Sequence, residues 1–302
     1  MRFSFFSPYF GQVLPSLTPL ILRSWGGNRV VTFIVHTNLA GEFAAIGAGT
    51  YDNIRIIETS REQFIDDLQA RLALNLRKYL RWDPWYLCRL KPAFGEAFTE
   101  LLQEYDFWGY LDIDVLLADL NRFLIKERFR DIDIDFYHKF GSATMVTLRN
   151  TPLVNTAWRK VPHYKRWLNR DEQYPGFEDD GGGFPTFVRR SSDLTIQQYE
   201  AAIDSLKIDF RWRQWLKLSW DESFRDVVYD GENMITTADQ RPRAALILDF
   251  LQKWSRYHTF VPPPLPVTFH GHPFEMFEQL VSYFRSPETI SMFLTPAVRF
   301  DK

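Results

Sequence analysis

The chain has 302 residues, enough for one large α/β domain with a sizeable buried core. Hydrophobic residues make up 45% and aromatic residues 17% of it, and 36 basic against 38 acidic residues leave a formal net charge of −2. This balance gives no polybasic surface, so no nucleic acid is expected as a partner. The one cysteine, Cys88, permits no internal disulfide and fits a reducing compartment, which indicates a cytoplasmic protein.

The apolar stretches of the chain do not predict a leader peptide or a membrane span. Ser4, Ser7, Pro8 and Gln12 interrupt the apolar residues that follow Arg2, and no small-residue cleavage site comes after them. No stretch reaches the roughly 18 apolar residues of a membrane-spanning helix. We therefore expect no transmembrane segment, while peripheral contact with a membrane surface stays open.

The first third of the chain alternates between strand and helix patterns. Strands are predicted where aromatic or β-branched residues run together, and helices where a capping box or a one-sided apolar stripe occurs. The expected strands cover residues 3–6, 30–36 and 54–57, and the expected helices cover residues 15–25, 60–80 and 94–105. The second helix opens with the capping box Ser60-Arg-Glu-Gln63. Such alternation is typical of a doubly wound α/β sheet.

A buried strand is predicted to end in two carboxylates. Phe107–Leu111 is aromatic or aliphatic apart from Gly109, which is typical of a parallel strand covered on both faces. Asp112 and Asp114 follow, and because side chains alternate along a strand, both carboxylates are expected on one face. Two such carboxylates favour a divalent cation, and Mg²⁺ or Mn²⁺ held by two protein groups keeps room for diphosphate oxygens.

An Asp-x-Asp pattern also arises by chance in solvated loops, and a second one competes here. Residues 131–136, Asp-Ile-Asp-Ile-Asp-Phe, also place carboxylates on one face of a strand. No buried strand precedes them, and the basic residues within 126–130 offer charge partners, so an exposed or edge strand is expected. Between the two motifs, residues 116–124 are predicted to form a helix.

Several motifs together resemble a known class of enzymes. They are Ser7-Pro-Tyr-Phe-Gly11, Tyr86-Leu-Cys-Arg-Leu-Lys-Pro-Ala-Phe-Gly95, Tyr105-Asp-Phe-Trp-Gly-Tyr-Leu-Asp-Ile-Asp-Val115, Thr147-Leu-Arg-Asn150 and Gln252-Lys253. The set resembles the nucleotide-sugar-dependent glycosyltransferases of the GT-A fold. It is most similar to an uncharacterised glycosyltransferase-like family of bacterial polysaccharide loci, which has a Trp-Gly-Tyr-x-Asp-Ile-Asp-Val motif. The resemblance covers about residues 1–255.

The resemblance implies a GT-A-like, Rossmann-like α/β fold with a mixed, mainly parallel sheet flanked by helices. It also implies that Asp112 and Asp114 hold the metal, Mn²⁺ or Mg²⁺. Without the resemblance, Lys91 is as well explained as a solvated lysine beside a proline as by contact with donor phosphates. The donor and cofactor contacts that the resemblance implies are Pro8, Tyr9, Phe10, His36, Thr37, Lys91, Asp112, Arg149 and Lys253.

The sequence departs from the family pattern at two places. Asn38 stands where an aspartate is more usual, and the loss of that carboxylate leaves recognition of the donor base unassigned here. Nearby His36 has two interpretations: a ligand contact, or an ordinary hydrogen-bonded histidine at a strand end. Phe250 stands where a histidine is more usual, which leaves a third protein ligand of the metal unassigned. The late histidines that remain as candidates are His258, His270 and His272.

The carboxylate that works on the acceptor is predicted at Asp171 and Glu172. The family carries an Asp-Glu pair at about this distance beyond its Arg-Asn motif, and a carboxylate can take the proton of an acceptor hydroxyl or form a covalent intermediate. The alternative is an ordinary helix-capping pair in a polar loop. Glu178 and the two aspartates after it stand beside three glycines, and we expect them to be held too loosely for catalysis.

The last part of the chain is predicted to be an appended extension. Thr195-Ile-Gln-Gln198 is a second capping box with a helix expected to Leu206, and residues 244–254 are expected to form a buried strand. A proline-rich stretch at residues 261–266 then leads to an amphipathic helix expected at 274–284. The predicted domains are therefore a catalytic domain, residues 1–258, and a linker with a C-terminal helical extension, residues 259–302.

The sequence thus predicts a metal-dependent glycosyltransferase, which moves a sugar from a nucleotide-diphosphate sugar to an acceptor hydroxyl. The acceptor is expected to be a glycan or glycoconjugate, in polysaccharide or glycoconjugate synthesis. The alternative from another class is a non-catalytic protein that binds glycans or nucleotide sugars with the same fold. A phosphoryl-transfer or hydrolytic enzyme is disfavoured because neither a P-loop nor a nucleophile motif accompanies the carboxylates.

Overall fold

The computed structural model describes residues 1–203 apart from 16–17, 81–83, 138–144, 169–175, 179–181 and 199–201, and four short strands within 226–270. The chain divides into two compact units. The first unit comprises Met1–Gln12, Arg29–Ile113 and Leu124–Glu200, and the second comprises Val13–Asn28, Asp114–Phe123 and Ala201–Lys302. Each unit is described by itself.

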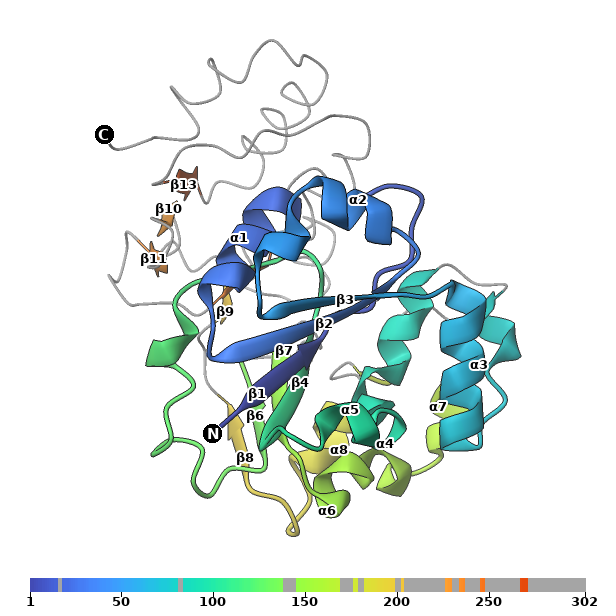
Figure 1. Cartoon of the computed structure of the whole chain (residues 1–302). Helices are drawn as coiled ribbons and strands as arrows, with labels where there is room; N and C mark the ends of the chain where they lie inside the picture. Colours follow the sequence, from blue (N-terminus) through green and yellow to red (C-terminus); the bar gives the residue numbers. More distant parts are fainter. Residues whose placement is uncertain are drawn as a thin grey trace. The chain divides into compact units, whose positions relative to one another are not determined.

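The first unit is built on a seven-stranded sheet of described strands in the order β3-β2-β1-β4-β7-β6-β8 (Figure 1). All neighbours pair in parallel except β7, which runs antiparallel to both β4 and β6. The prediction of a mixed, mainly parallel sheet flanked by helices is therefore confirmed. The strands are β1 (Phe3–Phe6), β2 (Val31–Thr37), β3 (Ile54–Glu58), β4 (Phe107–Leu111), β6 (Ile134–Phe136), β7 (Met145–Arg149) and β8 (Ile196–Gln198).

The central strands β1 and β4 are buried on both faces, as the sequence of β4 predicts. Every residue of β1 and of β4 is buried. Strands with both faces covered carry near-continuous apolar runs, because neither face is exposed to water. The register pairs Phe5 with Gly109 and Phe6 with Tyr110, so the two strands end side by side.

Helix α3 (Arg61–Leu72) begins at the predicted capping box. The Ser60 hydroxyl accepts a hydrogen bond from the Gln63 backbone N–H at 3.1 Å, and the Gln63 side chain accepts one from the Ser60 N–H at 2.9 Å. The predicted continuation to Leu80 is wrong, because Ala73 takes a left-handed conformation that ends the helix. The 3₁₀ helix η2 (Arg77–Leu80) follows.

Helices α3 to α8 lie on one side of the sheet (Figure 1). Their apolar residues form one buried cluster with Phe6, Ile34, Trp108 and Tyr110 of the strands. This layer consists of α3, α4 (Phe94–Ala97), α5 (Thr99–Leu102), α6 (Pro152–Asn155), α7 (Tyr164–Leu168) and α8 (Phe184–Val188). The remaining helices of this unit are α2 (Ala40–Ala45) and the 3₁₀ helices η1 (Ala48–Thr50), η2, η3 (Pro84–Ala93) and η5 (Ala157–Lys160).

The described part of the second unit centres on α1 (Thr18–Gly27) and β5 (Val115–Leu117). Trp25 Nε1 donates to the Val115 carbonyl at 2.9 Å, and the Leu117 N–H donates to Ser24 Oγ at 3.1 Å. The strands form the sheets β5-β12-β9 and β11-β10-β13. Its other elements are η4 (Leu120–Arg122), β9 (Ala202–Ile203), β10 (Asp226–Tyr229), β11 (Met234–Thr236), β12 (Ala245–Ile247) and β13 (Val267–His270). Among the helices that the structure describes, none is long and apolar enough to cross a membrane.

Three further local predictions are wrong, each because strand pairing overrides a local signal. The helix predicted at 116–124 is instead β5, which pairs with β12, followed by η4. The helix predicted from Thr195 starts as β8, which pairs in parallel with β6. The strand predicted within 131–136 exists as β6, but it is buried between β7 and β8 rather than exposed at an edge. Its expected basic partner is confirmed, since Arg128 pairs with Asp135.

Other predictions fall outside the described residues. The boundary at residue 258, the extension 259–302 with its helix at 274–284, and most of the strand expected at 244–254 cannot be compared beyond β12 and β13. The domain division therefore stays a prediction.

We expect Gly109→Ala to destabilise the first unit. An added Cβ would lie 2.3 Å from the Val146 carbonyl oxygen and 2.4 Å from the Phe5 ring, which forces the strands apart. Overpacking of this kind costs about 1–3 kcal/mol, measurable by urea unfolding. The control is Gly41→Ala, whose Cβ would meet nothing within 4 Å. Equal unfolding midpoints for the two variants would contradict the packing described.

Candidate functional site

The sheet order identifies one place where a ligand is expected. Starting at β1, the chain adds β2 and then β3 on one side and β4 on the other, so the strand order reverses between β1 and β4. Open α/β sheets bind ligands outside the carboxyl ends of the strands at such a reversal. β1 ends at Phe6 and β4 at Leu111, which brings the segment after Phe6 and Asp112 to the same edge of the sheet (Figure 1).

Asp112 is held at this edge by a buried ammonium. Lys91 Nζ forms a short ion pair with Asp112 Oδ1, and Cys88 Sγ lies 4.0 Å from the same oxygen. The Lys91 side chain is 4% exposed and that of Asp112 is 32% exposed. Among the described residues none hydrogen-bonds to Oδ2 of Asp112. One carboxylate oxygen is therefore fixed, and the other is available to a ligand.

Helix η3 positions Lys91 for this contact. Leu90 and Ala93, on either side of Lys91 and Pro92, are buried in the helical layer, so the backbone there is fixed by apolar packing. Burial, the largest single influence, disfavours the charged ammonium, but the charge and hydrogen bond of Asp112 together with smaller contributions from its other neighbours outweigh it and raise the pKa of Lys91 above its ordinary value. Lys91 is therefore a permanent cation, and the solvated-lysine interpretation is wrong.

The chemistry of this edge fits a divalent ion in part. Asp112 offers one hard oxygen, the donor type that Mg²⁺ and Mn²⁺ prefer. Asp114 belongs to the second unit, where it opens the segment Asp114–Phe123, and it is buried. Within the described residues there is no group of three or more His, Cys, Asp or Glu that could hold a metal. An ion at Asp112 would thus depend on phosphate oxygens and water for the rest of its ligands.

The segment after β1 extends the same edge. The Tyr9 N–H donates to the His36 carbonyl at 2.9 Å, which continues the pairing of β1 and β2 beyond Phe6. Pro8 and Tyr9 are half-buried and so remain accessible. Phe10 is buried and its ring centroid lies 5.2 Å from that of Phe64, which gives it a packing role. Whether these residues contact a donor stays a prediction.

His36 is enclosed by aromatic rings. Its ring centroid lies 5.1 Å from those of both Phe64 and Phe98, and its side-chain Nε2 has no hydrogen-bond partner among the described residues. Burial, followed by the charges of Arg55 and Arg71, lowers the pKa of His36 to about 4. The side chain is therefore neutral at pH 7. Neighbouring Thr37 is fully buried and accepts the Leu39 N–H at 3.1 Å, so both residues have structural roles whatever they bind.

Arg149 does not lie at this edge, which corrects the assignment of Arg149 to donor binding. It pairs with Phe107, the first residue of β4, so the length of β4, about 13 Å at roughly 3.3 Å per residue, separates it from Asp112. Its guanidinium pairs with Asp133 at 3.3 Å and donates to the backbone carbonyls of Phe129, Arg130 and Ile132. Arg149 stabilises the opposite end of the sheet.

The predicted catalytic pair, Asp171 and Glu172, and the predicted contact Lys253 lie outside the described residues. Glu178 comes shortly after the undescribed residues 169–175. It was expected to be loosely held, and that expectation is wrong. Its residue is 2% exposed and lies in a buried turn with Gly176 and Phe177. The signal in the sequence was the pair Gly176-Phe177, since a large apolar residue inside a polar, glycine-rich stretch indicates an anchored turn.

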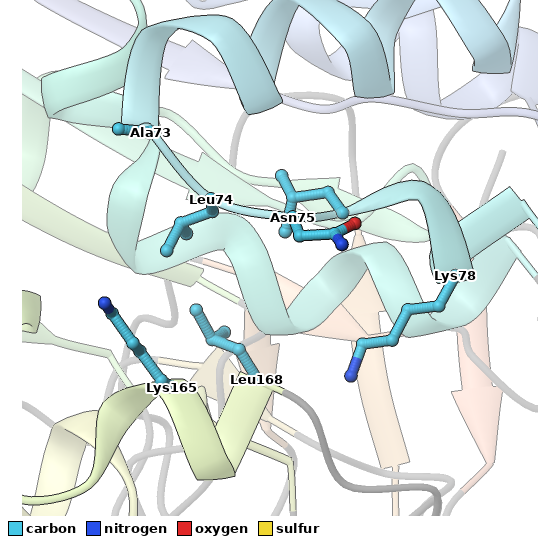
Figure 2. Close-up of a pocket in the computed structure, with 7 residues that line it drawn as sticks. Ala73, Leu74, Asn75, Lys78, Lys165 and Leu168 are labelled. Atoms are coloured by element: carbon cyan, nitrogen blue, oxygen red, sulfur yellow. The ribbon is translucent and has the colours of Figure 1, made fainter.

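A separate pocket of about 360 Å³ lies between the end of α3, η2 and α7. Figure 2 shows Lys78 and Lys165 at the pocket on two different elements, with the apolar Leu74 and Leu168 between them. Among the residues that the structure describes, its lining contains no carboxylate and no predicted site residue. The pocket is therefore distinct from the edge at Asp112.

The fold and the Asp112 edge define an α/β protein with an acidic site at the strand reversal of its sheet. The family of unknown function DUF6625 matches residues 5–210, and the chain belongs to that family. No curated protein matches the sequence.

Three solved structures are similar to the chain. The galactosyltransferase LgtC, in complex with donor and acceptor sugar analogs, is 13% identical over 95% of this chain and 97% of that chain, with a TM-score of 0.42. Mouse xyloside xylosyltransferase 1 is 10% identical over 70% and 89%, with a TM-score of 0.42. The glycosyltransferase GlyE of Streptococcus pneumoniae is 10% identical over 99% and 66%, with a TM-score of 0.43. Similarity of this degree assigns no activity to the chain.

We expect His36 to make the fold acid-sensitive. Because the pKa of about 4 in the folded protein lies below the ordinary 6.5, the unfolded chain binds the proton more readily. The stabilisation is complete above pH 6.5 and is lost as the pH falls towards 4. At pH 5 the free energy of unfolding is lower by about 2 kcal/mol than above pH 6.5. His36→Phe should remove this part of the pH dependence in urea unfolding, whereas His163→Asn, at an exposed histidine, should keep it. An unchanged pH profile in His36→Phe would refute the assignment.

Proposed function

We propose that this protein is a metal-dependent glycosyltransferase that moves a sugar from a nucleotide-diphosphate sugar to a hydroxyl of a glycan or glycoconjugate, in polysaccharide or glycoconjugate synthesis. The observation that supports the proposal most is the setting of Asp112: it follows a buried strand at the strand reversal, with one oxygen held by Lys91 and the other available. The motifs around Lys91 and Asp112, which resemble nucleotide-sugar-dependent enzymes, supply the substrate class.

In this proposal Asp112 and Asp114 hold Mn²⁺ or Mg²⁺, and the diphosphate completes the coordination. When bound, such an ion would neutralise the charge that develops on the departing diphosphate. Lys91 keeps Asp112 in one orientation, because its ammonium is permanently charged and buried beneath the carboxylate. Direct contact between Lys91 and a phosphate is disfavoured by this burial, so Lys91 acts through Asp112.

The half-buried Pro8 and Tyr9 stand at the same edge and are proposed to contact the nucleotide. Asp171 and Glu172 remain the proposed carboxylates on the acceptor side. Transfer to a hydroxyl requires a group that removes its proton or carries the sugar, and a carboxylate serves either route.

The test is calorimetric titration of a panel of nucleoside diphosphates with and without Mn²⁺. Wild type should bind at least one of them in a Mn²⁺-dependent manner, and Asp112→Asn should weaken that binding on the order of 100-fold. The matched control is the variant Glu104→Gln, which should bind as wild type. Glu104 carries an exposed carboxylate and lies just before the first residue of β4, at the end of the strand away from Asp112. Circular dichroism verifies that each variant is folded at the titration temperature.

Two outcomes would contradict the proposal. One is a wild-type protein that binds none of the nucleotides with either ion, and the other is an Asp112→Asn variant with wild-type affinity. Hydrolysis of the matching nucleotide sugar separates the enzyme from the non-catalytic alternative. A protein that binds the donor but never turns it over, with acceptors present, would be the binding protein.

A further inference from the structure

A side chain extends the pairing between β1 and β2 beyond the ends of both strands. The N–H groups of Ser7 and Tyr9 each donate to a carbonyl of β2 at 2.9 Å, so every second residue after β1 forms such a bond. Gly11 is the next donor in this series. Its N–H donates to the side-chain Oδ1 of Asn38 at 3.2 Å, so the amide of Asn38 takes the place of a strand carbonyl.

The amide of Asn38 forms this contact through both of its polar atoms. Its Nδ2 donates to the Gly11 carbonyl at 2.9 Å, while its Oδ1 accepts the Gly11 N–H. A carboxamide carries a donor and an acceptor, as a peptide group does, and therefore matches both main-chain groups. An ionised aspartate has acceptors only, so its second oxygen would face the Gly11 carbonyl oxygen. The Asn38–Gly11 contact thus requires an amide at position 38.

The Tyr9 ring lies against the residue that Asn38 holds. A Cβ at Gly11 would lie 2.9 Å from Tyr9 Oη and 3.1 Å from both Cε1 and Cζ of the same ring. The ring therefore lies over the Gly11 main chain, in the place that a side chain at position 11 would occupy. Because Asn38 fixes this main chain from both of its polar groups, it also fixes the surface on which the half-buried Tyr9 packs.

The Asn38–Gly11 contact lies at the edge of the sheet where Asp112 stands. Asn38 directly follows the last residue of β2, and β2, β1 and β4 run parallel, so their carboxyl ends share one edge (Figure 1). The amide of Asn38 has a second N–H and a second oxygen lone pair, so direct contact with the base of a nucleotide is the alternative role. The two roles differ in what they predict for the preference among bases.

We propose that Asn38 is a positioning residue of the candidate site, which holds residues 8–11 in the form that receives a nucleoside diphosphate and does not itself select the base. Both polar atoms of its amide are engaged by Gly11, which supports a holding role. A segment that is already ordered in its bound form binds more tightly, because less freedom is lost on binding. The ligand in this proposal rests on the proposed function, whereas the Asn38–Gly11 contact does not.

Amide hydrogen exchange in protein isotope-labelled at glycine tests the contact without any ligand. The Gly11 signal is assigned by its absence from the spectrum of Gly11→Ala. In Asn38→Ala the Gly11 N–H should exchange on the order of tenfold faster, because it loses its acceptor. The matched control is Asn53→Ala, since the Asn53 amide donates to the Val31 carbonyl at 3.1 Å at the other end of β2. This control should leave Gly11 exchange as in wild type, and unchanged exchange in Asn38→Ala would overturn the proposal.

The role at the site is tested by calorimetric titration of adenosine, guanosine, cytidine and uridine diphosphates in the presence of Mn²⁺. Asn38→Asp and Asn38→Ala should each weaken binding about tenfold, because the segment then spends only a small fraction of the time in the form that binds. The order of preference among the bases should stay that of wild type. Asn53→Asp, which places the same carboxylate at the other end of β2, should bind as wild type.

Two results of the titrations would overturn the positioning role. Wild-type affinity in both Asn38 variants, whatever their unfolding midpoints in urea, would make the contact purely structural. A changed preference among the bases would mean that Asn38 selects the base directly. If wild type binds none of the four nucleotides, the proposed function fails and the ligand of this proposal fails with it. Gly11 exchange then still decides whether Asn38 holds the segment.

Discussion

The ion pair between Lys91 and Asp112 is the interaction on which the candidate site depends. Lys91 is almost fully buried, and a buried ammonium without a partner costs several kcal/mol. Helix η3 can therefore pack over the end of β4 only where a carboxylate forms an ion pair with that ammonium. The dependence is mutual, since Asp112 stands at a strand end with nearly a third of its side chain exposed and takes its orientation from the ammonium. One contact thus fixes both the local packing and the direction of the available oxygen.

Close packing behind the pair sets its position. A Cβ at Gly95 would lie 2.4 Å from the Trp108 ring, and Trp108 in turn donates to Asn155 at 2.7 Å. The chain from Lys91 to Gly95 is thereby pressed against β4, whose own Gly109 admits the Phe5 ring. The motif residues around Lys91 and Gly109 are for this reason packing residues as well as neighbours of the candidate site. Their spacing brings a lysine and an aspartate together across 21 positions of sequence.

The sequence predicts those elements that short sequence patterns mark, and it predicts the edge of the sheet at which Asp112 lies. Strands β1 to β4 and the start of α3 follow from apolar runs and a capping box, and Asp112 follows from its place after β4. Arg149 was misplaced because strand direction is not written in a motif: β7 runs antiparallel, so its last residue meets the beginning of β4. The β8 strand was missed because its partner β6 is about sixty residues away in sequence. Glu178 was undervalued because composition alone does not reveal that one phenylalanine anchors a turn.

Two ion pairs of the first unit, Arg128–Asp135 and Lys91–Asp112, show why one is structural and the other is suited to chemistry. Asp135 is fully buried, its partner Arg128 is nearly so, and burial raises the pKa of Asp135 to about 7 against the opposing charge of that arginine. Such a closed pair has no exposed face for a ligand, so its role is confined to the interior of the sheet. Asp112 differs because its cation is buried, its own side chain is about a third exposed, and its second oxygen has no hydrogen-bond partner among the described residues. A carboxylate that is held on one side and open on the other keeps a fixed geometry without being neutralised on the side where a ligand arrives. That combination of a buried counter-charge and a partly exposed carboxylate makes the strand end the candidate site.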